Sequence, residues 1–181
     1  VRKIQQGYVF NKYGKLKLSI VVDELWKNSI FNLFDNLKKD LKNEFNLDLF
    51  PTYGTMLGAV REGDFINHDN DFGTSYISKE TEPEKVKSEF LNICEFLINK
   101  GYRLNVKDTH TWVYVENKIR FRYKLDIFIS YFNRQGDYQL TYGYHGKALR
   151  KSNDFFKFTK INLSNHQIEV PSNYEEILEQ L

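Results

Sequence analysis

Cysteine and long apolar runs are scarce in this 181-residue chain, and each scarcity excludes a class of structure. The single cysteine, Cys94, excludes an intramolecular disulfide and any zinc site built from cysteines. Because it lies in the apolar run LNICEFLI, we interpret it as a small buried hydrophobic residue rather than a nucleophile. No apolar run approaches the roughly 20 residues that cross a membrane, and no signal peptide is recognisable. We therefore expect no membrane-spanning segment and a cytoplasmic location.

An excess of charge of one sign is also absent. The chain has 26 Lys and Arg against 24 Asp and Glu, which leaves a net charge of +2. Proteins that bind nucleic acids usually carry a strong basic excess on one face, so we expect no nucleic-acid partner. A small phosphorylated ligand needs only a local cluster and stays open. With 41% apolar residues, including 15 Phe and 12 Tyr, the chain can bury a core and is not a disordered segment.

The three prolines form no Pro/Gly/Ser-rich linker, and no repeat is visible, so residues 1–181 are expected to form one domain. That domain can be an excised part of a longer chain, since the sequence starts at a valine. The hydrophobic pattern predicts an α/β or α+β domain, with a mixed sheet flanked by helices. Helices are expected over residues 18–46, 55–61, 81–100 and 172–181, with Thr81 and Ser172 as caps and Gly101 as a stop. Strands are expected over 47–53, 71–77, 102–106, 111–116 and 119–131, and as short pieces within 155–170. Residues 117–118 suit a tight hairpin turn. Residues 133–153 are expected to form an elaborated loop.

The segment from Tyr53 to Gly73 carries the most informative pattern. A strand is expected to end at Gly54-Thr55, where a short helix begins, and the backbone N–H groups of such a turn favour phosphate. Gly54 would let the backbone come close to a ligand. The alternative is an ordinary turn between a strand and a helix.

Three carboxylates follow this turn along the chain. Asp69 and Asp71 project to one face if their segment is extended, and carboxylates beside a phosphate suit Mg²⁺. The alternative is a solvated turn, and the spacing does not fit an EF-hand loop. Asp126 lies in the apolar run YKLDIFI, where a buried carboxylate is costly unless it is paired or bound to a metal. It would complete a three-carboxylate site if its strand lay beside Asp71, or it would form a buried ion pair with Lys124 or an arginine.

These motifs resemble the signature of the LicD/fukutin-related family. The resemblance rests on GTMLGAVR at 54–61, FI at 65–66 and HDND at 68–71, with support from KLDIFI at 124–129 and IEVPSNYEEIL at 168–178. It implies a nucleotidyltransferase-like fold that moves a phospho-alcohol group, such as phosphocholine or ribitol phosphate. The implied donor is a CDP-linked alcohol and the implied acceptor a sugar hydroxyl of a glycan, in cell-surface or capsule polysaccharide synthesis. Fusion to, or association with, a glycosyltransferase module would fit that role.

The resemblance also implies roles for individual residues. Gly54 and Thr55 would form the phosphate-side turn. Asp69, Asp71 and Asp126 would hold one or two Mg²⁺ or Mn²⁺ ions, and Asp126 would also be the candidate general base.

Four further positions complete the comparison with the family pattern. Arg61 would pair with a phosphate, or alternatively with the neighbouring acids at 62 or 64 on the surface. His68 would pack or orient the loop, with a catalytic base as the alternative. Asn67 stands where proline is common, and Gly73 stands where the family usually has a third alternating acid. The glycine would weaken or alter the metal site, or leave it inactive.

The stretch 138–157 is aromatic and basic, and it is a candidate for donor or acceptor binding. Its candidate residues are Tyr142, Tyr144, His145, Lys147, Arg150 and Lys151, with an ordinary exposed loop as the alternative. Two other functions stay open. One is nucleotidyl transfer to a hydroxyl of a small molecule or protein, and the other is a degenerate module that binds a sugar nucleotide or glycan without turnover.

Overall fold

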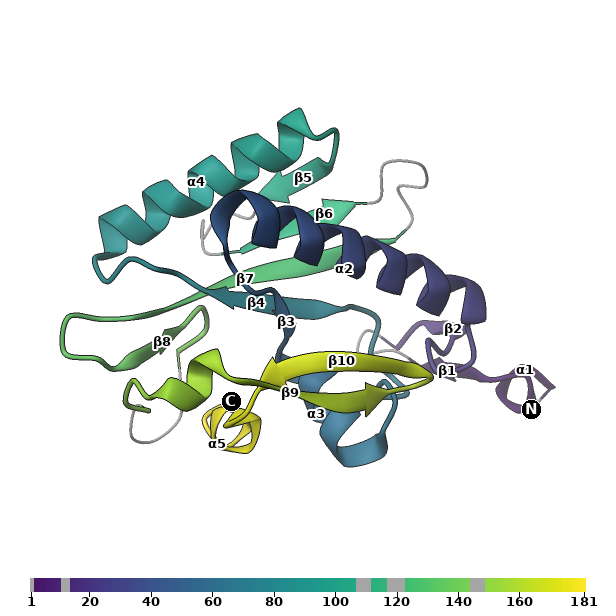
Figure 1. The fold of residues 1–181 in the computed structure, drawn as a ribbon. Helices are drawn as coiled ribbons and strands as arrows, with labels where there is room; N and C mark the ends of the chain where they lie inside the picture. The colour runs from purple at the N-terminus through teal and green to yellow at the C-terminus, as the bar shows by residue number, and fades with distance from the viewer. Residues whose placement is uncertain (1, 11–13, 107–111, 117–122, 144–148) are drawn as a thin grey trace.

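The chain folds around a six-stranded mixed sheet, in a computed structural model that describes residues 2–10, 14–106, 112–116, 123–143 and 149–181 (Figure 1). The strand order is β3-β4-β7-β6-β5, with β8 also paired to β7. The strands are β3 (Phe50–Pro51), β4 (Gly73–Ile77), β7 (Lys124–Phe132), β6 (Trp112–Glu116), β5 (Arg103–Val106) and β8 (Tyr138–Leu140). Only β4 and β7 are parallel to each other among these pairs. The expected mixed sheet flanked by helices is confirmed.

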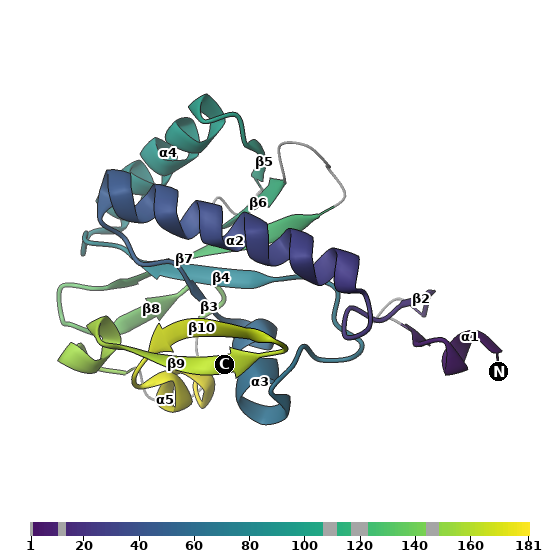
Figure 2. The same ribbon diagram turned by 45° about the vertical axis from the view of Figure 1, so that its right-hand side comes forward.

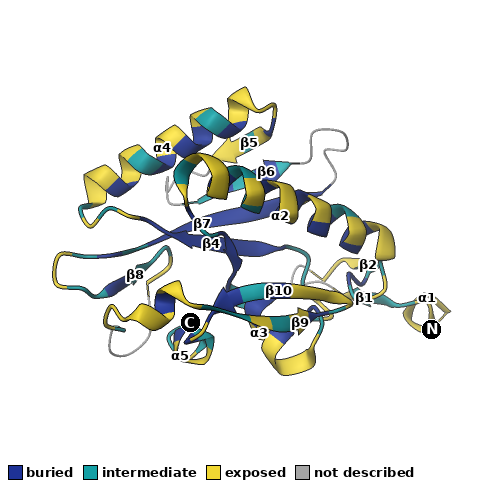
Figure 3. Cartoon of the chain, in the orientation of Figure 1, coloured by how far each residue is buried: buried dark blue, intermediate teal, exposed yellow. Residues whose placement is uncertain are grey.

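Helices cover one face of this sheet, and a second group of elements covers the other (Figures 1 and 2). The first face carries α2 (Glu24–Phe45) and α4 (Pro83–Asn99). The other side carries α3 (Tyr53–Glu62), with α5 (Tyr174–Leu178) and the 3-10 turn η1 (Asn153–Phe156) nearby. The antiparallel pair β9 (Phe158–Leu163) and β10 (His166–Pro171) lies beside β3, between α3 and α2, and the His166 ring stacks on Phe31 of α2 at 4.0 Å. Because β4 and β7 have neighbouring strands on both sides, they are buried along almost their whole length (Figure 3).

The N-terminal residues lie beyond the beginning of α2 (Figure 1). They form α1 (Arg2–Gln5) and the antiparallel pair β1 (Tyr8–Phe10) and β2 (Leu16–Leu18). Gly7 and Gly14 lie in turns of this segment and both have positive φ, at 84° and 69°. No described helix is both long and apolar enough to cross a membrane.

Helix α2 supplies much of the core, with an apolar stripe that repeats every three or four residues. Ile30, Leu37 and Leu41 on this stripe are fully buried. The predicted start at residue 18 is wrong, because Asp23 caps the helix by accepting a hydrogen bond from the Trp26 N–H at 3.0 Å. The apolar residues just before it are used in a turn that packs on the core rather than in the helix.

Other boundaries differ from the sequence prediction for local reasons. The strand predicted over 47–53 shortens to two residues, because Tyr53 already begins α3. Helix α4 starts after Glu82 rather than from a Thr81 cap, since Pro83 sets its first position. The residue preceding α5 is Asn173 rather than Ser172, whose hydroxyl donates to the Asp154 carbonyl at 3.0 Å.

The loop predicted over 133–153 contains the strand β8. Tyr138, which begins it, is 2% exposed and packs against the rings of Phe132 and Phe155 at 5.3 and 4.7 Å between centroids. The burial of Tyr138 favours an extended strand here. A strand of three residues is too short for its apolar and polar alternation to be recognised in the sequence. The hairpin predicted at 117–118 lies outside the described residues.

Candidate functional site

The pairing of β4 with β7 brings two of the predicted acids to one end of the sheet. In this parallel register Gly73 lies opposite Asp126, whose backbone N–H donates to the Phe72 carbonyl at 2.9 Å. The Thr74 hydroxyl donates to the Asp126 carbonyl at 2.7 Å and fixes the same register. Asp71 precedes β4 by two residues, so it reaches the pocket into which the buried Asp126 also faces.

That pocket has a volume of about 380 Å³ and is bounded by α3, β4, β6, β7 and the residues after β8. Its lining consists of Tyr53, Gly54, Thr55, Asp71, Gly73, Trp112, Tyr114, Asp126, Phe128 and Tyr142. No Lys or Arg occurs among these described lining residues. The pocket therefore combines two carboxylates with a largely aromatic surface.

The aromatic wall of the pocket consists of Tyr53, Trp112, Tyr114, Phe128 and Tyr142. The Phe128 ring lies at its centre, with centroid distances of 4.8 Å to Tyr53, 5.6 Å to Tyr142 and 5.5 Å to Trp112. Of these five, sequence reasoning named only Tyr142 as a candidate. The others are far apart in the chain and meet only through strand pairing, although Trp112 and Tyr114 alternate along β6 as residues on one face of a strand do.

Tyr53 has an unusual backbone conformation at the first position of α3. Its φ is +50°, in the left-handed region that side chains other than glycine rarely adopt. Such a conformation costs about 1–3 kcal/mol and is found mostly at functional sites. Here it turns the chain from β3 into α3 while the ring stays in the aromatic wall. Burial raises the pKa of the Tyr53 hydroxyl to about 12, so this group stays protonated at neutral pH.

Gly54 is needed for the approach of the acid loop, which we define as residues 63–72. A Cβ atom at position 54 would lie 2.6 Å from Asp69 Oδ2, which is closer than real Cβ contacts come. Asp69 thus lies against the beginning of α3, where the helix dipole favours negative charge. Asp69 is not among the residues that line the pocket. The sequence predicted close approach at Gly54 by a ligand, and the structure shows close approach by a carboxylate.

Thr55 ties the beginning of α3 to the beginning of β4. Its buried hydroxyl accepts a hydrogen bond from the Gly73 N–H at 2.9 Å. Thr55 also lines the pocket, so it lies where the sequence predicted a phosphate-side turn. In this structure its hydroxyl orients the two segments that carry Gly54 and Asp71.

Gly73 occupies a position with little room for a side chain. A Cβ atom there would lie 3.3 Å from the Thr52 carbonyl oxygen and 3.4 Å from Phe128 Cε2. A side chain at position 73 would therefore need small shifts of these neighbours, and the glycine supplies no third acid beside Asp126. Among the described residues, no three His, Cys, Asp or Glu side chains are grouped so as to hold a metal by themselves.

The donor atoms of the pocket suit an ion that binds together with a substrate. Mg²⁺ is usually held by one or two carboxylates, water and substrate phosphates, rather than by a cage made of protein alone. Asp71 and Asp126, which line the same pocket, supply two carboxylates of this kind. The residues present thus fit Mg²⁺ or Mn²⁺ with an open coordination sphere.

A lysine that sequence reasoning missed reaches the acid loop from the N-terminal strand pair. Lys17 Nζ donates to the Asp69 carbonyl at 2.9 Å. Burial lowers the pKa of Lys17, whereas the carboxylates of Asp69 and Asp71 oppose this shift by favouring the charged form. Nothing in the polar and basic pattern of residues 1–18 distinguishes Lys17 from its neighbours, so no sequence signal marks it.

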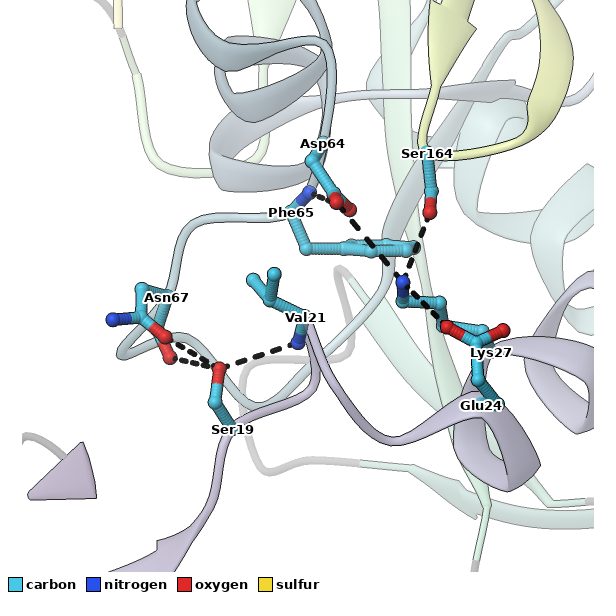
Figure 4. A network of polar contacts seen from close by, with 8 residues as sticks. All are labelled: Ser19, Val21, Glu24, Lys27, Asp64, Phe65, Asn67 and Ser164. Atoms are coloured by element: carbon cyan, nitrogen blue, oxygen red, sulfur yellow. Dashed lines mark hydrogen bonds and ion pairs between the residues drawn. The ribbon is translucent and has the colours of Figure 1, made fainter. Parts of the chain in front are cut away.

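Further polar contacts hold the acid loop from the same side (Figure 4). The Ser19 hydroxyl makes contacts of 2.9 Å to the Asn67 carbonyl and 2.6 Å to Asn67 Oδ1. The ammonium group of Lys27, a residue only 6% exposed, lies 3.0 Å from both Glu24 Oε1 and Ser164 Oγ. It also lies 4.0 Å from Asp64 Oδ2 at the start of the loop. Asn67 thus takes part in fixing the loop.

The remaining predicted site residues do not line the pocket. The exposed side chain of Arg61 pairs with Glu62, which was its alternative reading. His68 is exposed on the acid loop. Arg150 pairs with Asp137 and, mainly by this hydrogen bond, lowers the pKa of that carboxyl group.

Lys151, another candidate of this stretch, lies elsewhere. Its ammonium group is 5.6 Å from the ring centroid of Phe132 and 5.7 Å from that of Phe156. The candidates Tyr144, His145 and Lys147 lie outside the described residues.

Comparisons with known proteins place this site in a family. The family described as LicD/FKTN/FKRP, nucleotidyltransferase domain, matches residues 46–173, which is more than half of the chain. The match spans the acid loop, β4, β7 and the whole pocket lining, and it leaves out β1, β2 and all of α2. No curated protein matches the sequence.

Several solved structures are similar over part of the chain. The RNA terminal uridylyl transferase Cid1 is 14% identical with a TM-score of 0.46, over 61% of this chain and 32% of its own. The lincosamide antibiotic adenylyltransferase LnuA, bound to lincomycin, is 14% identical with a TM-score of 0.45, over 84% of both chains. The CdnC:HORMA-deltaN complex of E. coli MS115-1 has a chain 11% identical with a TM-score of 0.45, over 83% of this chain and 45% of its own. This chain thus covers about a third of the length of the uridylyl transferase.

Proposed function

Because the chain belongs to the LicD/FKTN/FKRP family, we propose that it transfers a phospho-alcohol group from a CDP-linked donor to a glycan hydroxyl, with the help of a divalent metal ion. The family supports phospho-alcohol transfer in glycan modification in general. The observation that carries the finer proposal is the pocket that Asp71 and Asp126 line together. Synthesis of cell-surface or capsule glycans is the proposed context, and the cytoplasmic location stays a prediction.

Asp71 and Asp126 are the proposed holders of Mg²⁺ or Mn²⁺. When bound, the ion would neutralise the donor's pyrophosphate and stabilise the departing CMP. Asp69 lies two residues before Asp71 on the acid loop, but outside the pocket lining. The pocket lining contains no Lys or Arg within the described ranges, so the charge of the donor's phosphates would be balanced mainly by the metal.

Asp126 is also the proposed general base. It is fixed in the middle of a sheet by its backbone hydrogen bonds, so its carboxylate would need little rearrangement to receive a proton. The attacking sugar hydroxyl would lose its proton to one carboxylate oxygen as it bonds to phosphorus, and the bond to the CMP oxygen would break. Transfer of this kind depends mostly on positioning and charge neutralisation.

The aromatic wall bears on which alcohol the donor carries. Aromatic faces attract cations, and aromatic cages are a common binding site for quaternary ammonium groups such as choline. A pocket with five aromatic side chains and two acids therefore favours phosphocholine over ribitol phosphate. Stacking on the cytosine ring or on the acceptor sugar would use the same surface. A comparison of CDP-choline with CDP-ribitol distinguishes binding of the alcohol from binding of these other groups.

The test is calorimetric titration of CDP-choline, CDP-ribitol, CTP and CMP into the protein, with and without Mg²⁺ or Mn²⁺. We expect metal-dependent binding of a CDP-alcohol that Asp71→Asn abolishes. Asp154→Asn, an exposed acid away from the pocket, is the matched control and should bind as the unchanged protein does. Binding that needs no metal and persists in Asp71→Asn would reject the proposal.

The family's description as a nucleotidyltransferase domain favours one alternative, nucleotidyl transfer to a hydroxyl of a small molecule or protein. The products decide between the two reactions. A CDP-alcohol that releases CMP supports phospho-alcohol transfer, whereas CTP or another NTP that releases pyrophosphate supports nucleotidyl transfer. The tight packing at Gly73 favours a further alternative, a binding module without turnover, which would bind donor and release neither product.

A further inference from the structure

The N-terminal strand pair, which the family match does not reach, adds one positive charge to the site. The match begins at residue 46, yet Lys17 on β2 donates to the Asp69 carbonyl at 2.9 Å, across 52 positions of sequence. Two residues later, Ser19 is 1% exposed and bonds to Asn67 on the same loop. The placement of Lys17 is therefore fixed by a buried neighbour rather than by a chance surface contact.

The charges around Lys17 define what its ammonium group can do. The carboxylates of both Asp69 and Asp71 are close enough to act on it electrostatically. Asp71 also faces the pocket, but Asp69 lies behind it, against the first turn of α3. One ammonium group therefore lies near two carboxylates, and the three groups together carry one net negative charge.

A second metal ion would have to use the charge of Asp69, which the Lys17 ammonium group offsets. Two-metal sites hold their ions roughly 3.5–4 Å apart, which requires several carboxylates to offset the repulsion between the ions. Position 73 is glycine and supplies no ligand, and a Cβ atom there would lie 3.4 Å from Phe128 Cε2. The described residues contain no group of three potential metal ligands.

We propose that Lys17 takes the place of a second metal ion: the pocket binds a single divalent ion between Asp71 and Asp126, while the Lys17 ammonium group balances the charge of Asp69. This inference rests on the metal site of the proposed function. Lys17 is a positioning residue, because it holds the acid loop from outside the pocket. Asp69 is then a partner of Lys17 rather than a ligand of the ion.

The number of bound Mn²⁺ ions, counted by electron paramagnetic resonance in the presence of CDP, tests the proposal without any measurement of turnover. We expect one ion in the unchanged protein and one in Lys17→Arg, which keeps the charge. In Lys17→Met the net charge of Asp69 and Asp71 falls from about −1 to −2, so a second, weaker ion should bind. The double variant Lys17→Met with Asp69→Asn should return to one ion, because the second ion needs Asp69.

Lys39→Met, an exposed lysine of α2, is the matched control and should bind one ion. Thermal melting shows whether each variant folds, and the count in the unchanged protein tests the proposal even if Lys17→Met does not. Two ions in the unchanged protein, or one ion in folded Lys17→Met, would overturn it. No bound ion in any variant would reject the metal site itself, and with it the metal dependence of the proposed function.

Discussion

Gly73 and Asp126 face each other across the parallel strands β4 and β7, and this pairing determines the chemistry of the pocket. Side chains opposite each other on neighbouring strands share one face of a sheet. An acid at position 73 would therefore stand beside Asp126, but the glycine supplies none. The result is a pocket with two acids and an aromatic centre.

Asp126→Asn should abolish turnover while the fold is kept. The substitution preserves the shape of the side chain but removes a metal ligand and the proposed proton acceptor. Loss of a general base alone lowers a rate by about 10²–10⁴-fold. CMP release from the bound CDP-alcohol measures the rate, and thermal melting measures stability. Unchanged turnover would exclude Asp126 from the reaction.

The site residues that could be predicted from the sequence are those with an unusual local sequence environment. Asp126 was recognisable because a lone acid in an apolar strand is costly, and Asp71 because alternating acids follow a strand-helix turn. Lys17 and Trp112 were missed because an exposed-looking lysine and an alternating aromatic residue are ordinary in any sequence. Their place in the site depends on strand pairing between distant segments, which local patterns do not determine.

The fold was predictable to a similar degree. Long periodic segments such as α2 and α4 were found, and their ends moved where a cap overrode periodicity, as Asp23 does. The strand β8 was missed because Tyr138 is buried by contacts with η1 and the end of β7 rather than by its own short pattern.

Gly54→Ala should displace the acid loop. The added Cβ would lie 2.6 Å from Asp69 Oδ2, so either α3 or the loop has to move. We expect loss of metal-dependent donor binding in calorimetry with a smaller loss of thermal stability. Combining Gly54→Ala with Asp69→Ala removes the clash and should recover part of the binding. If Gly54→Ala alone binds normally, the close contact is not required.

Thr55→Val should weaken the link between α3 and β4. The substitution keeps the size of the side chain but leaves the buried Gly73 N–H without its acceptor, which costs about 1–3 kcal/mol in free energy of unfolding. Thr55→Ser keeps the hydroxyl and is the matched control. Urea denaturation measures both variants, and equal stability of Val and Ser variants would show that this bond contributes little.

Cys94 should be unreactive in the folded protein. Burial raises the pKa of its thiol from 9.0 to about 11, so at pH 8 the thiolate fraction is roughly a hundredfold lower than in the unfolded chain. Iodoacetamide labelling followed by mass spectrometry, with and without urea, measures the difference, and Cys94→Ser provides the unlabelled control. Because the folded state holds this proton more tightly, the thiol's contribution to stability is complete below pH 9 and is lost as the pH rises towards 11. Rapid labelling of the folded protein at pH 8 would contradict the burial of Cys94.

Trp112→Leu should separate donors by the charge of their alcohol. The indole ring lies 5.5 Å from the Phe128 centroid at the centre of the aromatic wall, whereas leucine keeps an apolar surface without a π face. A lost cation–π contact is worth about 0.5–2 kcal/mol, so the KM for CDP-choline should rise severalfold or more while that for CDP-ribitol changes little. Phe156→Leu, an exposed aromatic residue outside the pocket, should alter neither value. An equal rise for both donors would instead assign the aromatic wall to the cytosine ring that they share.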